Sequence, residues 1–515
     1  MPFHICTLKL WLGKIWGEEM TGILSLLLGI PLVGMVAVYG AGRVRESYAK
    51  WTALLFSLLA FAISSVLYGG FDSGAKGMQF LESHVWVKSL GISYLVGVDG
   101  ISLPLVLLTT FLCLAAVGSS WYEIRERPVA YYCLYLLLEL GMLGTFVALD
   151  FFLFYIFWEI VLVPMFFIIG MWGGPRREYS AIKFFIYTHV ASLVMLLGII
   201  AMYLFNGATT FSMLDLSRVT YPWSFAKYVF PALFFGFIVK MPVVPFHTWL
   251  PDAHVEAPTP GSVILAGVLL KMGGYGLIRI AIGMMPEAAK VFSPWIAILA
   301  LISIFYGAFA SMAARDMKRL IAYSSVSHMG YVLLGTAAGI VAIGDPSLLR
   351  AGATAFDGAI FQMVSHGLIS GMLFMMAGLV HHQTHTRIID ELGGLAKKMP
   401  ATMTALVFAS LASLGLPSLS GFVAEFLIFI GSFAIFKVTT IAAVGVVVVT
   451  AAYYLWMLQR MVFGPTRESL SGVLDVHARE LLPAAFLIIF IILLGIYPRP
   501  LLDIMDATVV SFLGG

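Results

Sequence analysis

The sequence predicts an all-α, polytopic membrane protein of about 14 transmembrane helices. Hydrophobic residues make up 61% of the 515 residues and charged residues only 11%. The mean hydropathy is +0.98, and both values lie far outside the usage of soluble domains. Apolar stretches of about 20 residues, long enough to cross a ~30 Å hydrocarbon core as helices, recur along the chain. We expect spans near residues 21–41, 51–70, 101–121, 129–149, 150–170, 181–205, 226–247, 259–282, 292–313, 319–341, 355–381, 402–433, 438–463 and 482–505.

Two segments outside these spans need separate interpretation. Residues 71–98 alternate in character in HVWVKSLGISYLVGVDG, which predicts a short hairpin on the membrane surface. The first 20 residues lack the long apolar core of a secretory signal. They fit either an interfacial amphipathic segment or an extension that precedes a natural start at Met20. No soluble domain is expected.

Lysines and arginines lie mainly in the loops that follow odd-numbered spans. Arg43, Arg45, Arg176, Arg177 and Arg387 are examples. Cytoplasmic loops of membrane proteins carry the excess of positive charge. We therefore expect that end of the bundle to face the cytoplasm and both chain termini to lie on the opposite side.

Several classes of function are disfavoured by the composition. The net charge is only +3 and is spread over short loops, which argues against nucleic-acid binding. Cys6, Cys113 and Cys133 show no C-x-x-C spacing, so neither an iron–sulfur cluster nor a disulfide framework is expected.

Two groups of histidines raise the question of a metal site. His381, His382 and His385 fit a solvated cluster at a helix end better than a zinc site, which needs further ligands at defined spacing. For His247 and His254 a structural role in a loop is favoured over metal binding, and a role in proton uptake stays open. No metal site is predicted.

Lys240, Lys271 and Glu425 lie deep in apolar runs. A charge at mid-bilayer costs roughly 2.5–3.5 kcal/mol by insertion scales, so such residues are retained mainly where they carry protons, ions or substrate. Glu159 also lies within a span, and an isolated carboxylate there needs a partner or a proton. Lys240 is its natural partner.

Three further residues within spans are weaker candidates. His328 and His366 suit a proton relay, because imidazole titrates near neutral pH. A hydrogen-bonded packing role is the alternative for each. Glu139 is a lesser candidate that could instead support helix packing.

Two predicted spans are interrupted beside these ionisable residues. Pro242 and Pro245 break the seventh span next to Lys240. Gly415, Pro417 and Gly421 interrupt the twelfth span before Glu425. Irregular backbone at membrane depth survives only where it is buried in protein or lines a wet cavity, although a kink without function is the alternative.

Matching breaks are typical of transporters built from inverted repeats. The predicted units are residues 129–282 (spans 4–8) and 292–463 (spans 9–13). Residues 1–128 carry spans 1–3 and residues 482–515 carry span 14. In this arrangement the broken spans 7 and 12 occupy equivalent positions in the two units.

Long motifs at these residues resemble one known family, the antiporter-like, proton-translocating membrane subunits of respiratory complex I. The resemblance covers almost the whole chain. Its most specific pieces are GVDGISLPLVLLT at 97–109, FWEIVLVPMFF at 157–167, VKMPVVPFHTWLPDAHVEAPTPGSVILAGVLLKMGGYGL at 239–277, RLIAYSSVSHMGYV at 319–332 and FVAEF at 422–426.

The resemblance implies a role for each candidate. Glu159 and Lys240 would form a paired carboxylate and lysine, Lys271 the central relay lysine and Glu425 the terminal carboxylate. His328 and His366 match the family's histidines along a hydrated axis. Glu425 favours the M type of these subunits, because the sister L and N types resemble the pattern but carry a lysine there. The long lateral helix of the L type is absent from this sequence.

The implied function is proton translocation within NADH:quinone oxidoreductase, a translocase of the bacterial inner membrane. This chain would perform no redox chemistry and bind no cofactor, while NADH, flavin, iron–sulfur clusters and quinone would belong to partner subunits. The implied partners are the other membrane subunits and, indirectly, the peripheral redox arm. A subunit of a multisubunit cation/proton antiporter is the alternative, and a purely structural scaffold is a third. The sequence leaves open the electron donor, the quinone and the exit route for protons.

Overall fold

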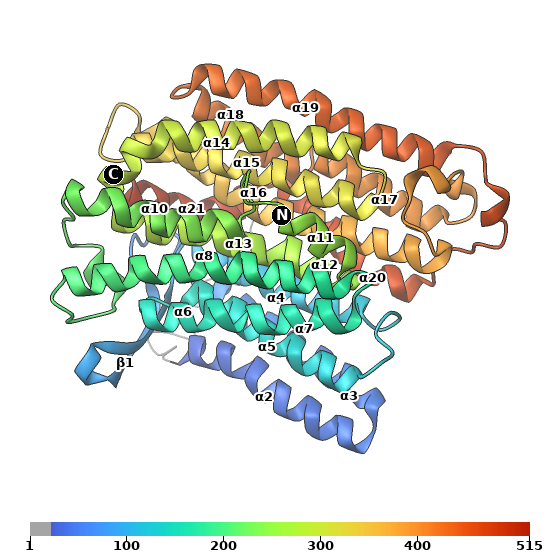
Figure 1. Cartoon of the computed structure of the whole chain (residues 1–515), viewed down its shortest axis with the longest axis horizontal. Helices are drawn as coiled ribbons and strands as arrows, with labels where there is room; N and C mark the ends of the chain where they lie inside the picture. Colours follow the sequence, from blue (N-terminus) through green and yellow to red (C-terminus); the bar gives the residue numbers. More distant parts are fainter. Residues whose placement is uncertain (1–21, 515) are drawn as a thin grey trace, which may run out of the picture.

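The computed structural model describes residues 22–514. Membrane-length helices lie side by side in one bundle, with their axes running roughly along the horizontal of Figure 1. Twelve crossings in the described part are long and apolar enough to span a membrane. Two further crossings are each divided into two shorter helices, so the predicted all-α polytopic class is confirmed. The question of whether residues 1–20 are interfacial or precede a start at Met20 lies outside the described residues.

The twelve continuous crossings follow the predicted order. They are α2 (Ile23–Val44), α3 (Glu46–Gly70), α4 (Ser102–Ser119), α5 (Pro128–Val147), α6 with α7 (Phe151–Ile160 and Leu162–Trp172), α8 (Arg177–Phe205), α12 to η3 (Thr259–Ile282), α14 (Pro286–Ala313), α15 (Met317–Ala342), α16 (Leu349–Thr384), α19 with η6 (Lys437–Leu458 and Gln459–Phe463) and α20 (Ala478–Ile496).

The two divided crossings are those where the sequence predicted breaks. The seventh consists of α10 (Trp223–Lys240) and α11 (Trp249–Glu256). The twelfth consists of α17 (Pro400–Ser413) and α18 (Ser420–Phe433). Each break falls in the fourth crossing of a predicted five-crossing unit. The boundaries of those units stay a prediction.

The predicted hairpin is also present. β1 (Gln79–Val87) pairs with β2 (Ile92–Val98) in an antiparallel sheet at one end of the bundle (Figure 1). The hairpin is bonded to the short segment between α5 and α6: the Leu149 N–H donates to the Leu95 carbonyl at 2.9 Å. The Ser93 N–H donates to the Asp150 carboxylate at 3.0 Å.

The end of the chain differs from the prediction of one span over 482–505. Helix α20 ends at Ile496, and a separate helix, α21 (Arg499–Phe512), packs against α16. Pro498 causes the break, because proline lacks an N–H and disfavours helical backbone in the preceding residue. The Thr508 hydroxyl of α21 accepts a bond from the Gly100 N–H at 3.0 Å, which ties α21 to the hairpin end of the bundle.

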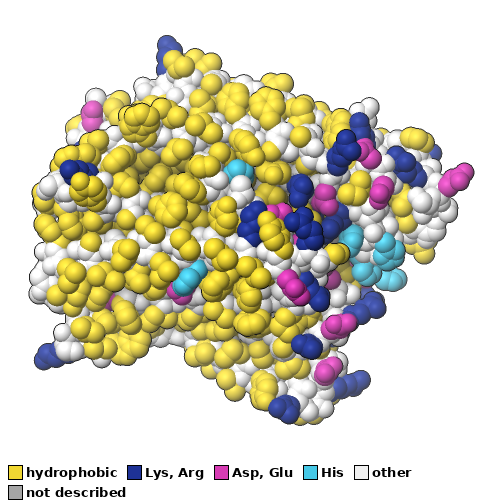
Figure 2. All heavy atoms as spheres, viewed as in Figure 1, with side chains coloured by type: hydrophobic (Ala, Val, Ile, Leu, Met, Phe, Trp, Pro, Cys, Tyr) yellow, Lys and Arg dark blue, Asp and Glu magenta, His cyan; other side chains and the backbone are white. Residues whose placement is uncertain are grey.

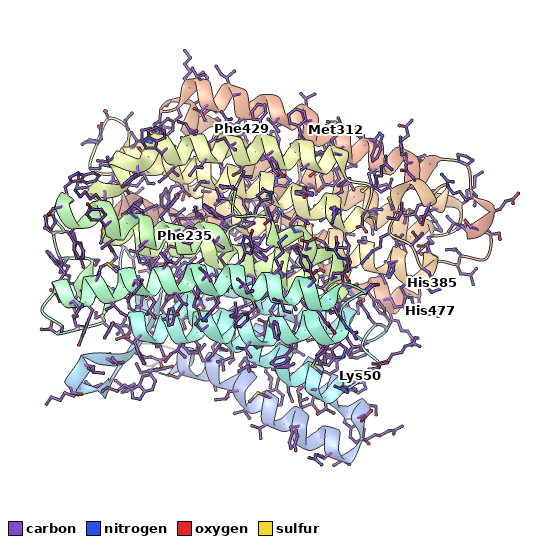
Figure 3. The ribbon with its side chains drawn as sticks, viewed as in Figure 1. Lys50, Phe235, Met312, His385, Phe429 and His477 are labelled. Atoms are coloured by element: carbon purple, nitrogen blue, oxygen red, sulfur yellow. The ribbon has the colours of Figure 1, made fainter. Side chains whose placement is uncertain are left out.

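Burial divides the helices into an inner and an outer set. Three crossings are almost wholly buried in the bundle: α15, α16 and the crossing that runs from α12 to η3. By contrast, α2, α3 and α20 are largely uncovered. On the face shown in Figure 2, hydrophobic side chains cover most of the surface and basic side chains gather towards one end. Lys50, His385 and His477 lie at that same end (Figure 3). The positive-inside rule predicts that this end faces the cytoplasm.

Candidate functional site

Lys240 is the last residue of α10, beside the first break. Its side chain is 2% exposed, and its Nζ lies 5.3 Å from the ring centroid of Trp158 and 5.8 Å from that of Phe184. Aromatic faces attract a cation, more strongly where water is excluded. The indole N–H of Trp249 donates to the Val239 carbonyl at 3.0 Å. This bond gives a partner to a carbonyl at the end of α10, where the break interrupts the helical hydrogen bonds. The ammonium group is therefore held in an aromatic pocket inside the bundle.

Glu159 lies on α6 and is directed towards α8. One carboxylate oxygen lies 3.1 Å from Nδ1 of His189, and the other accepts a bond from the Ser192 hydroxyl. No ion pair within 4.0 Å joins Glu159 to Lys240 among the described residues. The pairing of Glu159 with Lys240 that the sequence predicts is therefore not a direct ion pair: two polar groups three residues apart on α8 face the carboxylate, while rings surround the lysine.

Glu159 is also less buried than the sequence suggested. Its side chain is 24% exposed and that of His189 is 36% exposed. The reason is that α8 is an outer helix of the bundle, with much of its surface uncovered. Sequence reasoning missed His189 and Ser192, because a single histidine and a serine in an apolar span carry no distinguishing spacing.

Lys271 lies at the centre of the bundle and is fully buried. It belongs to α13 (Leu270–Gly276), which is flanked by two π-helical segments, η2 (Leu265–Leu269) and η3 (Leu277–Ile282). The Lys271 ammonium donates to the carbonyl of Ala266, in η2. It also lies 2.7 Å from Nδ1 of His366. Local π-helix is frequent at functional sites, and here it presents a carbonyl to the buried lysine.

A chain of titratable side chains continues from Lys271. The rings of His366, on α16, and His328, on α15, have centroids 5.5 Å apart. Nδ1 of His328 lies 3.4 Å from the carboxylate of Glu425, on α18. All three residues are at most 6% exposed. The structure thus brings together four of the six residues to which the resemblance assigns a role. These four, Lys271, His366, His328 and Glu425, form the central chain of titratable groups.

A small cavity accompanies the last part of this chain. His328, His366 and Glu425 line it, together with Gln362 and Ser413. Its volume of about 10 Å³ gives room for roughly one water molecule. The cavity lies next to the second break, as expected if irregular backbone at membrane depth lines a polar space.

Hydroxyl groups extend the network sideways from His328. The Ser413 hydroxyl lies 3.3 Å from Nε2 of His328 and donates to the Tyr454 hydroxyl at 2.9 Å. Tyr454 in turn donates to the Ser324 hydroxyl at 3.0 Å. No pattern in the sequence marks these residues, because serine and tyrosine are common in membrane helices and these three are far apart in the chain.

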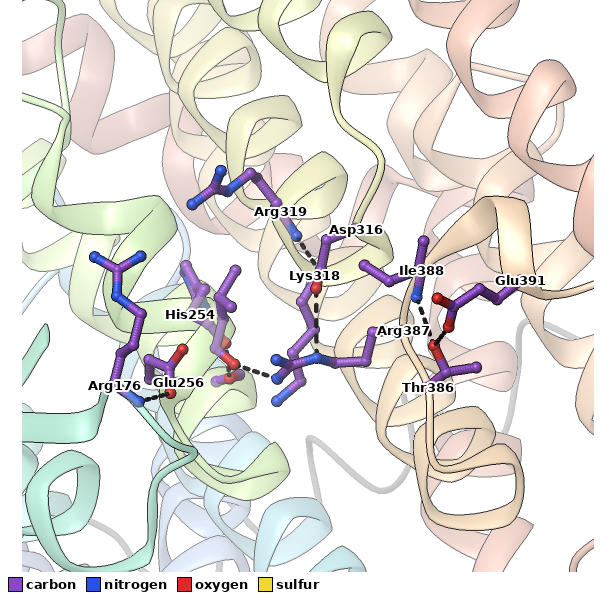
Figure 4. A network of polar contacts seen from close by, with 12 residues as sticks. Arg176, His254, Glu256, Asp316, Lys318, Arg319, Thr386, Arg387, Ile388 and Glu391 are labelled. Atoms are coloured by element: carbon purple, nitrogen blue, oxygen red, sulfur yellow. Dashed lines mark hydrogen bonds and ion pairs between the residues drawn. The ribbon is translucent and has the colours of Figure 1, made fainter.

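A second polar network lies towards the end predicted to be cytoplasmic (Figure 4). Lys318 is buried and donates to the Ala257 carbonyl at 2.8 Å. His254, on α11, is fully buried, and its ring stacks on Phe374 with centroids 4.3 Å apart. Neither nitrogen of His254 has a hydrogen-bond partner in the described part of the chain. His254 therefore lies on a helix, not in the loop that the sequence suggested.

The remaining candidates lie apart from the central chain. Glu139 is fully buried and accepts a bond from the Ser57 hydroxyl at 3.0 Å. At the end of α16, the ring of His382 meets that of Tyr122 edge to face, with centroids 5.5 Å apart. Within residues 22–514, no group of three or more His, Cys, Asp or Glu side chains is arranged to hold a metal ion.

Comparison with known proteins places this architecture in a family. Residues 148–451 match the family described as "NADH:quinone oxidoreductase/Mrp antiporter, TM". The chain is 43% identical to NADH-quinone oxidoreductase subunit M of Rhodobacter capsulatus, over 95% of this chain and 96% of that protein. It is also 43% identical to F(420)H(2) dehydrogenase subunit M of Methanosarcina mazei, over 94% of this chain and 97% of that protein.

Solved structures agree with the sequence comparison. A chain of respiratory complex I from Thermus thermophilus superposes with a TM-score of 0.84 at 27% identity, covering 96% of this chain and all of that one. A chain of the Mrp complex from Dietzia sp. superposes with a TM-score of 0.80 at 18% identity, over 95% and 98% of the two chains, and supports the fold alone. The chain therefore belongs to the NADH:quinone oxidoreductase/Mrp antiporter family of transmembrane proteins.

Proposed function

We propose that this chain is a proton-translocating membrane subunit of a complex I-type quinone oxidoreductase, and that Lys271, His366, His328 and Glu425 carry the proton. The observation that supports this most directly is their placement as one buried series. Lys271 and His366 lie 2.7 Å apart, and His328 and Glu425 lie 3.4 Å apart. A buried charge is costly, so two contacting pairs of ionisable groups, with ring centroids 5.5 Å apart between them, are explained best by proton transfer.

The proposed path begins on the side predicted to be cytoplasmic. Lys240 accepts a proton in its aromatic pocket, and Glu159 adjusts the stability of that charge. The proton passes to Lys271, whose direct contact with His366 provides the next step. The gap between the rings of His366 and His328 requires ring rotation or one water molecule, and the cavity beside them can hold one. Glu425 receives the proton last.

The energy that the proposed proton translocation requires follows from the membrane potential. Moving one proton against about 180 mV costs roughly 4 kcal/mol, at about 2.3 kcal/mol per 100 mV. In this proposal the energy comes from electron transfer in other subunits. NADH, flavin, iron–sulfur clusters and quinone belong to those partners, and this chain binds its membrane neighbours in the inner membrane of a bacterium. The names of the relatives include both NADH-quinone and F(420)H(2) enzymes, so the electron donor follows from the partners rather than from this chain.

Two substitutions test the proposal in reconstituted vesicles. Replacing Lys240 or Glu425 with alanine is expected to abolish proton movement through this chain while the complex still assembles. The readout is the number of protons moved per electron, measured with a pH-sensitive dye. A wild-type ratio in either variant would refute the role given to that residue.

The alternative is a subunit of a multisubunit cation/proton antiporter, favoured by the fold shared with the Mrp complex. Co-purification in mild detergent separates the two possibilities. Partners that carry flavin and iron–sulfur clusters support the proposal, whereas a preparation containing only membrane antiporter subunits contradicts it.

A further inference from the structure

Asp357 is a buried carboxyl group that the central chain does not use. It lies on α16, nine residues before His366, and its side chain is 8% exposed. Its Oδ1 atom has no hydrogen-bond partner within residues 22–514. An unpaired buried polar group costs about 1–3 kcal/mol. Asp357 therefore adds nothing evident to the stability of the fold.

Asp357 lines an open pocket at the end of the bundle opposite the basic loops. The pocket has a volume of about 500 Å³ and is formed by the start of α16, by α18 and by α21. Asp503, Asp506 and Arg499 of α21 are its other charged lining residues. Arg499 lies 3.3 Å from Asp503, which leaves the pocket with a surplus of negative charge. Such a surface raises the local concentration of protons and other cations.

The pocket lies just beyond Glu425 on the way out of the membrane. Helices α16 and α18 run antiparallel in close contact: a Cβ on Gly358 would lie 2.6 Å from the Ile428 nitrogen, and one on Gly431 2.3 Å from the Ala355 nitrogen. With these residues opposite each other, Asp357 lies level with a point on α18 about four residues beyond Glu425. At 1.5 Å per residue, the step is about 6 Å outward.

We propose that Asp357 is the outer carboxyl group of the proton exit path, which receives the proton from Glu425 and releases it into the pocket of Asp503 and Asp506. The inference rests on the proposed function. The step is a proton transfer alone: Glu425 loses the proton, Asp357 becomes the neutral acid, and the proton leaves to water in the pocket. Leu427 of α18, two residues beyond Glu425, lines the same pocket.

The test uses the intact complex in vesicles. Asp357→Asn keeps the size of the side chain but cannot release a proton. It is expected to lower the number of protons moved per electron by the same fraction as Glu425→Gln, whereas Asp357→Glu retains most of the wild-type ratio. Asp215→Asn is the matched control, because Asp215, on the short helix α9 (Met213–Leu216), is an exposed aspartate that lies outside both the pocket and the series from Lys271 to Glu425. This control is expected to keep the wild-type ratio.

A second variant leaves the carboxyl group in place. Ala507, on α21, lines the pocket, and Ala507→Trp fills it. Loss of proton movement in an assembled Ala507→Trp complex supports an exit through this pocket, and a wild-type ratio contradicts it. The infrared absorption of protonated carboxyl groups gives an independent readout. A band present in the wild type and missing from Asp357→Asn supports proton binding at Asp357, and identical spectra contradict it.

The results separate this inference from the proposed function. A wild-type ratio in Asp357→Asn, together with a loss in Glu425→Gln, overturns the exit path and leaves the function intact. Wild-type ratios in both variants overturn the function and the exit path with it.

Discussion

Lys271→Arg tests whether position 271 must release its proton or only carry a positive charge. Arginine keeps the charge, but the reference pKa values of arginine and lysine differ by at least about 2 units. Deprotonation of arginine therefore costs at least about 2.7 kcal/mol more, which slows transfer through this position by about 100-fold or more. We expect loss of proton movement through the chain although the charge is retained.

A second variant at this position, Lys271→Met, should abolish proton movement without preventing assembly of the complex. Lys271→Met removes the donor to the Ala266 carbonyl and to His366, which costs about 1–3 kcal/mol for each acceptor left unpaired. It also removes a buried charge, whose desolvation cost is of several kcal/mol. The two effects oppose each other, so we expect the complex to assemble in normal yield and to move no protons through this chain.

The assay is the ratio of protons to electrons in vesicles, with assembly checked by the yield of the intact complex. Lys437→Arg is the matched control. Lys437 lies at the start of α19, with its Nζ 5.6 Å from the Phe433 ring centroid, and is outside the central chain. A wild-type ratio in Lys271→Arg would refute the reasoning, because it would show that a fixed charge is sufficient.

Three further predictions concern contacts that hold the site and the hairpin in place. Tyr454→Phe removes the hydroxyl between Ser413 and Ser324 and should lower stability by about 1 kcal/mol while reducing proton movement only partly; an unchanged thermal unfolding temperature would contradict it. Asp150→Ala removes the N-cap of α6, which accepts from the Phe152 and Leu153 N–H groups. It should cost about 1–2 kcal/mol, whereas Asp150→Asn should keep the cap, lose the bond from the Ser93 N–H and fall between wild type and Asp150→Ala in the same thermal assay. Gly91→Ala places a Cβ 2.0 Å from the Thr209 carbonyl oxygen at a φ of +64°, so the hairpin should become sensitive to protease; equal digestion rates for variant and wild type would rule this out.

The ionisable groups of the central chain are identifiable from the amino-acid sequence alone. Lys271, Glu425 and Lys240 stand out because each interrupts a long apolar run, and that is a local property of the sequence. The breaks are equally predictable, since Pro242 and Pro417 act on the backbone beside them. The hairpin follows from alternation within residues 71–98.

Contacts between helices could not be predicted in the same way. In a soluble protein the polar face of a helix reveals which side is buried, but in a membrane both the lipid-facing and the core-facing sides are apolar. The rotation of α6 therefore decides that Glu159 contacts His189 and Ser192 instead of Lys240. Residues remote in sequence, such as Ser413 and Tyr454, meet only through packing.

By itself the sequence determined the membrane class, the order of the spans, the two breaks and the chemical groups buried beside them. Hydropathy, proline and charge act on neighbouring residues, so short segments of the sequence are sufficient to predict these features. Only the tertiary structure decided which of those groups touch, that α21 packs against α16 at the hairpin end of the bundle, and that Asp357 borders an acidic pocket at a level about four residues beyond Glu425. These depend on the depth and rotation of whole helices, which many weak contacts between distant residues fix together.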